Sequence, residues 1–156
     1  MNTLNPRRHG QFATLVDPKI VWPAIGSSFI KLDPRSADAY INRGNAERDR
    51  LALGDAIADY TRAIDLSPSA ALAFYNRAWA RYLGGDNRLA LADVDQAIKL
   101  NPGSASAFST RGLIRERLSD SSGAIADFHK ALAIDPSFQQ PAEGLRRLQA
   151  GTSPTR

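Results

Sequence analysis

Four prolines recur at a constant interval along the chain, and this interval limits the possible folds more than any other feature. Pro34, Pro68, Pro102 and Pro136 are each separated by 34 residues. Five further series of matching residue class keep the same spacing: Tyr40, Phe74 and Phe108; Gly44, Ala78 and Gly112; Ala56, Ala90 and Ala124; Tyr60, Val94 and Phe128; and Ala63, Ala97 and Ala131. A fixed period of this length predicts an array of similar units that stack on one another.

Each unit is predicted to contain two amphipathic helices. In the second half of the second unit, apolar residues from Leu89 to Leu100 follow spacings of three and four, which place them on one helical face. Pro102 ends this helix because the residue before a proline is pushed out of the helical backbone region. Serine side chains are then available to cap the following helices, at Ser36, Ser69 and Ser104.

Small and turn-forming residues indicate where the two helices of a unit separate. The break is predicted at Gly84-Gly85-Asp86 in the second unit and at Ser119-Asp120-Ser121 in the third. The first unit has Gly54-Asp55 instead, so we expect its turn about three residues later and its first helix to be longer. The Gly44 and Ala56 series are placed where the paired helices should cross, and larger residues there would overpack by about 1–3 kcal/mol or more.

The period, with an aromatic, Gly or Ala, Ala, aromatic, Ala and Pro in this order, resembles the tetratricopeptide repeat (TPR). The resemblance covers residues 37–136 as three full units. It implies an all-α fold, a right-handed α-solenoid of helix-turn-helix repeats, preceded by a degenerate N-terminal half-unit and closed by a C-terminal capping helix. Upstream of Pro34 the pattern is weaker, because Trp22, Pro23 and Gly26 stand where the family usually has Ala, Ile and an aromatic residue.

These observations divide the chain into an ordered array with less regular ends. Residues 1–19 show no period, and we expect them to be disordered or irregular. The remaining predicted parts are a degenerate half-repeat at 20–34, a TPR domain at 35–149 and a flexible tail at 150–156. Within the domain, the repeats are 37–70, 71–104 and 105–138, followed by the capping helix 139–149.

Two charged series also keep the 34-residue register. One precedes the Gly/Ala position and the other precedes the aromatic position of the second helix: Arg43, Arg77 and Arg111; and Asp59, Asp93 and Asp127. A solvated face has no reason to keep both identity and register in three units. We therefore expect structural Arg–Asp pairs that bridge helices, bidentate where the geometry allows. The alternative is shared ancestry with tolerance, and neither interpretation gives these residues a catalytic role.

In the family that the chain resembles, the first helix of each unit lines a concave groove. The second unit is unusual because Phe74 already supplies the core aromatic, which leaves Tyr75, Trp79 and Tyr82 as additional aromatics on one helical face. Exposed Trp and Tyr are typical of recognition hot spots, although they could also pack between helices. The candidate peptide-binding residues are Asn45, Arg48, Tyr75, Trp79, Tyr82, Leu113 and Glu116.

One type of family member binds the C-terminal carboxylate of chaperones through basic residues and asparagines. This sequence offers Asn45 and Asn76 at matching offsets, but the basic positions hold Ile41, Ser106 and Thr110. Without those charges the carboxylate has no cationic partner, so we reject a chaperone-tail site. Asn45 remains a candidate for hydrogen bonding to a peptide backbone.

No motif for chemistry is found in the sequence. There is no cysteine, and neither His9 nor His129 has a carboxylate or second histidine at metal-ligand spacing; His129 is expected to face solvent. Phosphate-loop, dinucleotide and nucleophile-elbow patterns are absent. We therefore predict a protein that is not an enzyme and has no metal or cofactor.

The charge distribution argues against nucleic acid as a partner. The formal net charge is +4, but residues 37–136 hold twelve basic and thirteen acidic residues, so the basic excess lies at the two ends. A nucleic-acid binder needs basic residues clustered on one face. No apolar run reaches the roughly 18 residues of a membrane helix, and no signal-peptide core follows Arg7 and Arg8, so we expect a cytoplasmic protein without a membrane partner.

Two functions follow as hypotheses. The first is a non-catalytic scaffold that binds a peptide or protein segment in the concave groove. The second is a self-assembly module, a possible homo-oligomer, that pairs through the degenerate N-terminal face with Trp22, Ile25 and Phe29.

Overall fold

The computed structural model of the chain describes residues 26–151. Within this range a helical segment at residues 26–32 precedes seven helices, and no strand is present. The helices are α2 (Ala37–Asp49), α3 (Leu53–Leu66), α4 (Ala71–Leu83), α5 (Asn87–Leu100), α6 (Ala105–Arg117), α7 (Ser121–Ile134) and α8 (Gln139–Gly151). The expectations for residues 1–19, for the first part of 20–34 and for residues 152–156 lie outside the described residues.

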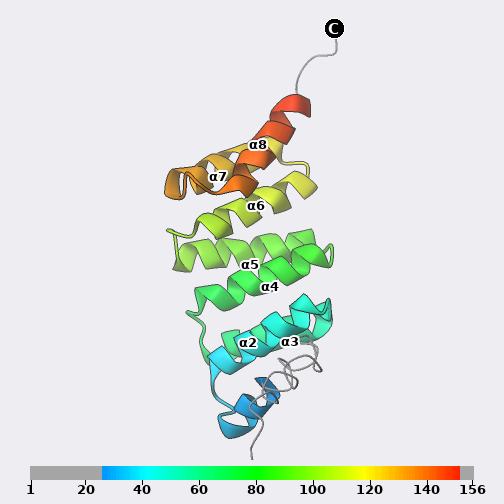
Figure 1. Cartoon of the computed structure of the whole chain (residues 1–156), viewed down its shortest axis with the longest axis vertical. Coiled ribbons are helices and arrows are strands. Elements are labelled where there is room, and N and C mark those ends of the chain that lie inside the picture. The colour runs from blue at the N-terminus through cyan, green and yellow to red at the C-terminus, as the bar shows by residue number, and fades with distance from the viewer. Residues whose placement is uncertain (1–25, 152–156) are drawn as a thin grey trace, which may run out of the picture.

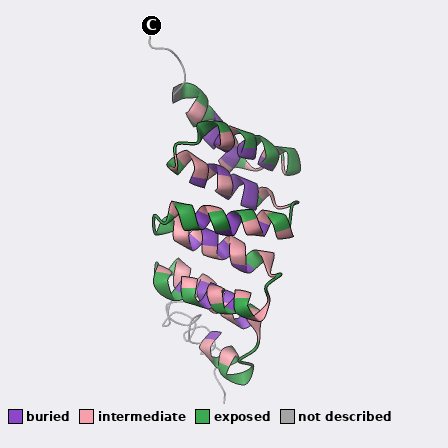
Figure 2. Ribbon diagram, turned by 180° about the vertical axis from the view of Figure 1, so that it is seen from behind, coloured by how far each residue is buried: buried purple, intermediate pink, exposed green. Residues whose placement is uncertain are grey.

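The helices form hairpins that are stacked along the long axis of the molecule (Figure 1). The pairs α2/α3, α4/α5 and α6/α7 follow one another, and α8 covers the last pair. Buried residues follow the sides of the helices that face a neighbour, with exposed residues on the outer sides (Figure 2). The predicted all-α solenoid of helical hairpins is therefore confirmed.

The turn of the first hairpin differs from the prediction. Helix α2 has 13 residues, as do α4 and α6, and it ends at Asp49 rather than near Gly54. Leu51 takes a left-handed backbone with φ of 63°, at the position that Gly85 and Ser119 occupy with φ of 88° and 63°. A leucine costs about 1–2 kcal/mol in this conformation. Helix packing in register with the other hairpins overrides that local preference.

Only two of the three expected serine caps are formed. The hydroxyls of Ser36 and Ser104 accept hydrogen bonds from the backbone N–H groups of Ala39 and Ala107, both at 3.2 Å. The expected cap by Ser69 is wrong, since α4 begins after Ala70 and has no side-chain cap. The reason is register: the position 34 residues after Ser36 is 70, and Ser69 lies one residue too early to reach the first turn.

The close crossing of each hairpin depends on matched residue sizes. A Cβ atom added to Gly44 would lie 2.7 Å from Cε1 of Tyr60, and one added to Gly112 would lie 2.5 Å from Cε1 of Phe128. In the middle hairpin the corresponding pair is Ala78 with the smaller Val94, and both are fully buried. A large side chain on the second helix is therefore opposite glycine, and a smaller one is opposite alanine.

Candidate functional site

A cleft of about 590 Å³ lies across three successive layers of the solenoid, on α4, α6 and α8. Four of the seven predicted groove residues line it: Trp79, Tyr82, Leu113 and Glu116. Its other lining residues are Arg117, Gln140, Glu143 and Arg147. The cleft is thus formed by first helices of consecutive units, with the capping helix taking the place of a fourth.

Aromatic rings form one wall of this cleft. Trp79 and Tyr82 are one helical turn apart on α4 and stack with ring centroids 5.3 Å apart and an angle of 26° between the planes. The guanidinium carbon of Arg117 lies 4.6 Å from the centroid of Tyr82, a cation–π contact. Trp79 is only partly buried, so part of its indole remains available to a ligand.

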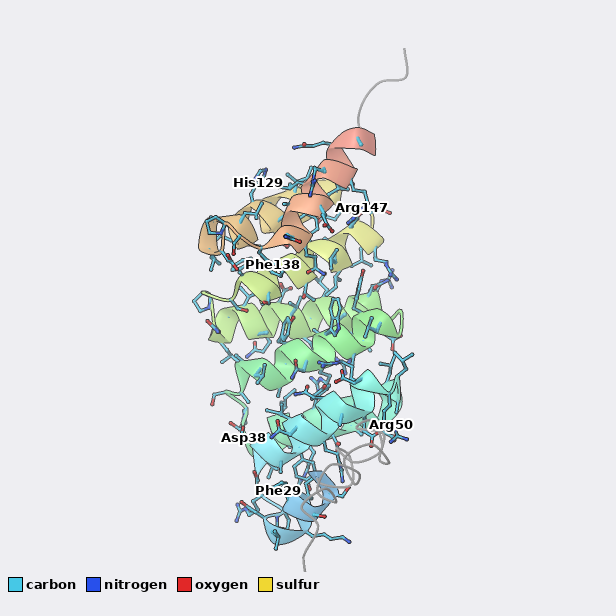
Figure 3. All side chains as sticks on the ribbon, viewed as in Figure 1. Phe29, Asp38, Arg50, His129, Phe138 and Arg147 are labelled. Carbon is cyan, nitrogen blue, oxygen red and sulfur yellow. The ribbon has the colours of Figure 1, made fainter. Side chains whose placement is uncertain are left out.

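A bidentate ion pair joins the other two helices of the cleft. Arg147 on α8, labelled in Figure 3, donates to both carboxylate oxygens of Glu116 on α6 at 2.7 and 2.6 Å. This hydrogen bonding raises the pKa of Arg147 above its ordinary value. Glu116 is therefore held by the protein itself, and its charge is neutralised within the wall of the cleft.

Three predicted groove residues are not in the cleft. Tyr75 packs against the buried cluster around Ala78 and Val94. Arg48 donates to its neighbour Asp49, at 3.0 Å from Nη2 to Oδ1. The aromatic face expected on α4 is therefore split between the core and the cleft.

Asn45, the third, is occupied by interactions within the protein. Its Oδ1 accepts hydrogen bonds from the Tyr60 hydroxyl at 2.8 Å and from Nδ2 of Asn76 at 3.0 Å. Burial raises the pKa of Tyr60 to about 12, so its hydroxyl stays protonated and keeps donating at neutral pH. The amide oxygen of Asn45 thus links two repeats, and it is not open for the peptide backbone contact that we expected.

Sequence reasoning missed the contribution of the capping helix, although the repeat register contained the signal. Gln140, Glu143 and Arg147 lie 34 residues after Ser106, Ser109 and Leu113, all of which occupy groove offsets. Treating residues 139–149 only as a solvating cap concealed this continuation. Ser109 itself is fully buried and donates to Oε1 of Gln140 at 2.9 Å, which fixes the start of α8 on α6.

The structure brings each arginine of the charged series together with the aspartate of its own unit. In every hairpin the Nε and Nη2 groups donate to the two carboxylate oxygens, with distances between 2.6 and 2.9 Å: Arg43–Asp59, Arg77–Asp93 and Arg111–Asp127. The aspartates are buried, with side chains 4–7% exposed. These hydrogen bonds raise the pKa of Arg43 and Arg111 above the ordinary value of arginine.

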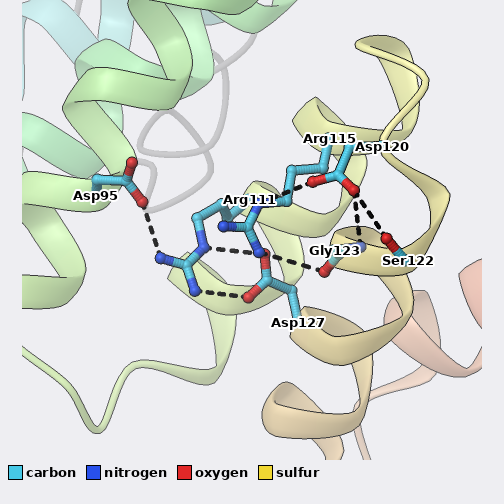
Figure 4. Close-up of polar contacts among 7 residues, drawn as sticks. All are labelled: Asp95, Arg111, Arg115, Asp120, Ser122, Gly123 and Asp127. Atoms are coloured by element: carbon cyan, nitrogen blue, oxygen red, sulfur yellow. Dashed lines mark hydrogen bonds and ion pairs between the residues drawn. The ribbon is translucent and has the colours of Figure 1, made fainter.

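The same arginines also reach back to the preceding layer. Nη1 of each donates to a side chain 16 residues earlier, at 3.4, 3.0 and 2.8 Å: Arg43 to Ser27, Arg77 to Thr61 and Arg111 to Asp95. Each guanidinium therefore joins the two helices of its hairpin and the helix before it. Figure 4 shows this arrangement for Arg111, with Asp127 on one side and Asp95 on the other.

A second arginine reinforces the aspartate in two of the three hairpins. Arg81 donates to Asp93 at 2.6 Å, and Arg115 donates to Asp127 at 2.8 Å, as Figure 4 shows for the latter. The corresponding residue of the first hairpin is Glu47, so Asp59 has a single arginine. The three ion-pair sites thus differ in charge while sharing one geometry.

The remaining polar features give no support to catalysis or to a carboxylate clamp. Ile41 and Thr110, at two of the clamp's basic positions, are 4% and 2% exposed and belong to the packing between helices. Between residues 26 and 151 no group of three His, Cys, Asp or Glu residues could hold a metal ion. His129 is exposed on α7 (Figure 3). No helix in this part of the chain is long and apolar enough to cross a bilayer.

Comparisons with known proteins agree with this geometry. The family profile of the tetratricopeptide repeat matches residues 27–71, 53–105 and 75–137. No curated protein matches the chain by sequence. Among solved structures, MamA is 22% identical, with a TM-score of 0.77 over 83% of this chain and 75% of that one. This likeness concerns the fold alone.

Two structures that contain peptides are also similar. The first TPR of Spaghetti (RPAP3) bound to the HSP90 peptide SRMEEVD is 28% identical, with a TM-score of 0.74 over 78% of this chain and 97% of that one. The second TPR domain of human RPAP3 in complex with the HSP70 peptide SGPTIEEVD is also 28% identical, with a TM-score of 0.70 over 81% and 98%. The right-handed superhelix of stacked hairpins is common to all three, and the chain belongs to the tetratricopeptide repeat family.

Proposed function

We propose that this protein is a non-catalytic scaffold that binds a peptide or an extended protein segment in the cleft formed by α4, α6 and α8. The observation that carries the proposal is the position of Trp79, which is stacked on Tyr82 and partly exposed at the cleft wall. Aromatic side chains held in place by their neighbours lose little entropy on binding and dominate many recognition surfaces. The two similar domains with bound HSP90 and HSP70 peptides support peptide binding as the type of activity.

Replacing Trp79 with alanine is expected to abolish most of this binding. Peptides selected from a displayed random library on the native chain should bind the Trp79→Ala variant about thirtyfold more weakly, since a hot-spot residue contributes roughly 2 kcal/mol or more. The measurement is a titration of each selected peptide by calorimetry. Circular dichroism on the same samples checks that the helices are retained.

His129→Ala is the matched control, because His129 is exposed on α7 and lies outside the cleft. Its affinity for the selected peptides should equal that of the native chain. If Trp79→Ala keeps its helical signal and binds the peptides as tightly as the control does, the cleft is not the binding site.

Self-association is the second candidate function, and exposed apolar side chains at the N-terminal end favour it. Phe29 is 59% exposed and Leu32 is 83% exposed, beside a cleft of about 360 Å³ that reaches Asn42 on α2. Trp22 and Ile25, which the sequence also suggested for this face, lie outside the described residues.

Under this second hypothesis, light scattering should give a mass above that of one chain at micromolar concentration. Phe29→Ser combined with Leu32→Ser should then shift the protein to a monomer, because burying two large apolar side chains contributes roughly 3–6 kcal/mol. A native chain that is monomeric at this concentration removes self-assembly as a function.

A further inference from the structure

The cleft contains charges that the protein does not use. Glu116 and Arg147 neutralise each other through two hydrogen bonds. Arg117 contacts the face of Tyr82, but it forms no ion pair or hydrogen bond with any residue that the structure describes. The same holds, within the described residues, for the carboxylate of Glu143 on α8. One cation and one anion therefore remain available to a ligand.

The stacking on Tyr82 makes Arg117 a prepared anion-binding group. Because the flat face of the guanidinium lies 4.6 Å from the ring centroid, the edges with the N–H donors stay free. An arginine held in this way loses less conformational entropy when it binds a carboxylate than a free one does. Glu143 is exposed and can accept donors from an ammonium or guanidinium group.

The spacing of these two charges follows from the register of the helices. On α6 and α8, residues that contact one another are 31 positions apart, as in Ser109–Gln140 and Glu116–Arg147. Glu143 is therefore at the height of Gly112, five residues before Arg117 on α6. At 1.5 Å per helical residue, the two charges are about 7–8 Å apart along the helix direction.

An extended peptide matches this separation. It rises about 3.3 Å per residue and points alternate side chains to the same face, so residues i and i+2 are about 6.6 Å apart. The apolar wall formed by Trp79 and Leu113 is next to this pair of charges.

We infer that the partner segment is a zwitterionic extended peptide, in which an acidic and a basic residue are separated by one residue and accompanied by an apolar side chain. The acidic group pairs with Arg117, the basic group pairs with Glu143, and the apolar side chain contacts Trp79. This inference rests on the proposed function, because it specifies the ligand of the same cleft.

The test uses the indole of Trp79 as the reporter in the full chain. Trp22→Phe leaves Trp79 as the single tryptophan of the protein. The probe is an acetylated, amidated heptapeptide, Gly-Asp-Ser-Lys-Ser-Leu-Gly, prepared also in the reverse order, because the geometry sets the distances and leaves the chain direction open. The control peptide is its neutral counterpart, with Asn for Asp and Gln for Lys.

In one of the two orders, the charged peptide should bind about tenfold more tightly than its neutral counterpart at low salt, since two exposed ion pairs contribute up to about 1 kcal/mol each. The difference should shrink in 1 M salt, where the screening length is about 3 Å. Arg117→Gln combined with Glu143→Gln should remove the difference while leaving the affinity for the neutral peptide unchanged.

The outcomes separate this inference from the proposed function. If charged and neutral peptides alter the Trp79 fluorescence with equal affinity, the charge rule is wrong and peptide binding in the cleft stands. If neither peptide alters the fluorescence while library-selected peptides do, the inferred ligand class is wrong. If the selected peptides also leave Trp79 unaffected, both proposals are overturned.

Discussion

Replacing Gly112 with alanine should destabilise the protein by about 3 kcal/mol, although it adds a single methyl group. That methyl carbon would lie 2.5 and 2.7 Å from Cε1 and Cδ1 of Phe128. The ring cannot move away, because its other edge faces Gly144, where an added Cβ would lie 2.5 Å from Cε2. Phe128 is fully buried between the two glycines, so the helices themselves must separate.

Urea denaturation followed by circular dichroism measures this effect, and Gly54→Ala is the matched control. Gly54 also lies in a helix, but a Cβ added there meets nothing within 4 Å. Because alanine is favoured over glycine in helices by about 1 kcal/mol, this substitution should be neutral or stabilising. Equal losses of stability in the two variants would show that the crossing at Phe128 has room for a methyl group.

The middle hairpin suggests how the defect can be relieved. There, alanine at the crossing is combined with Val94 in place of the aromatic. Phe128→Val should therefore offset part of the loss caused by Gly112→Ala. The double variant is expected to be more stable than the sum of the single effects predicts, with a coupling of roughly 1 kcal/mol or more.

The period of the sequence was sufficient to predict the hairpins, but local residue signals placed some of their ends wrongly. Gly54 indicated a late turn, yet Leu51 adopts the left-handed conformation that the shared register requires. Ser69 had the chemistry of a cap but the wrong position by one residue. In both cases packing between repeats determines the helix ends, and a single residue's preference of about 1 kcal/mol does not override it.

The site was predictable as far as the repeat offsets extend. These offsets identified Trp79, Tyr82, Leu113 and Glu116, all of which line the cleft. They could not show that Asn45 is occupied by Tyr60 and Asn76, or that Tyr75 packs in the core, because neighbouring offsets on one helix face different partners. Which side chains pair with one another depends on distances across helices, and the sequence pattern does not contain them.

The second large effect is expected at Asp127, where asparagine should destabilise the protein by roughly 3–5 kcal/mol. The carboxylate accepts hydrogen bonds from Nε and Nη2 of Arg111 and from Nη1 of Arg115, at 2.9, 2.6 and 2.8 Å. Asparagine has nearly the same shape but no charge, and its amide group turns donors toward the guanidinium donors. Two arginines are then left without a counterion next to a position that is 4% exposed.

The three hairpins provide the comparison that assigns this loss to charge rather than to shape. Asp93→Asn removes the counterion of two arginines in the same way, whereas Asp59→Asn affects only Arg43 and leaves Glu47 nearby. Stability measured in urea should therefore fall by similar amounts for Asp127→Asn and Asp93→Asn, and by clearly less for Asp59→Asn. Because the aspartates are buried, 1 M salt should not remove the difference. Equal losses at all three positions would mean that each aspartate acts through its hydrogen-bonding shape, and that the second arginine adds nothing to the hairpin.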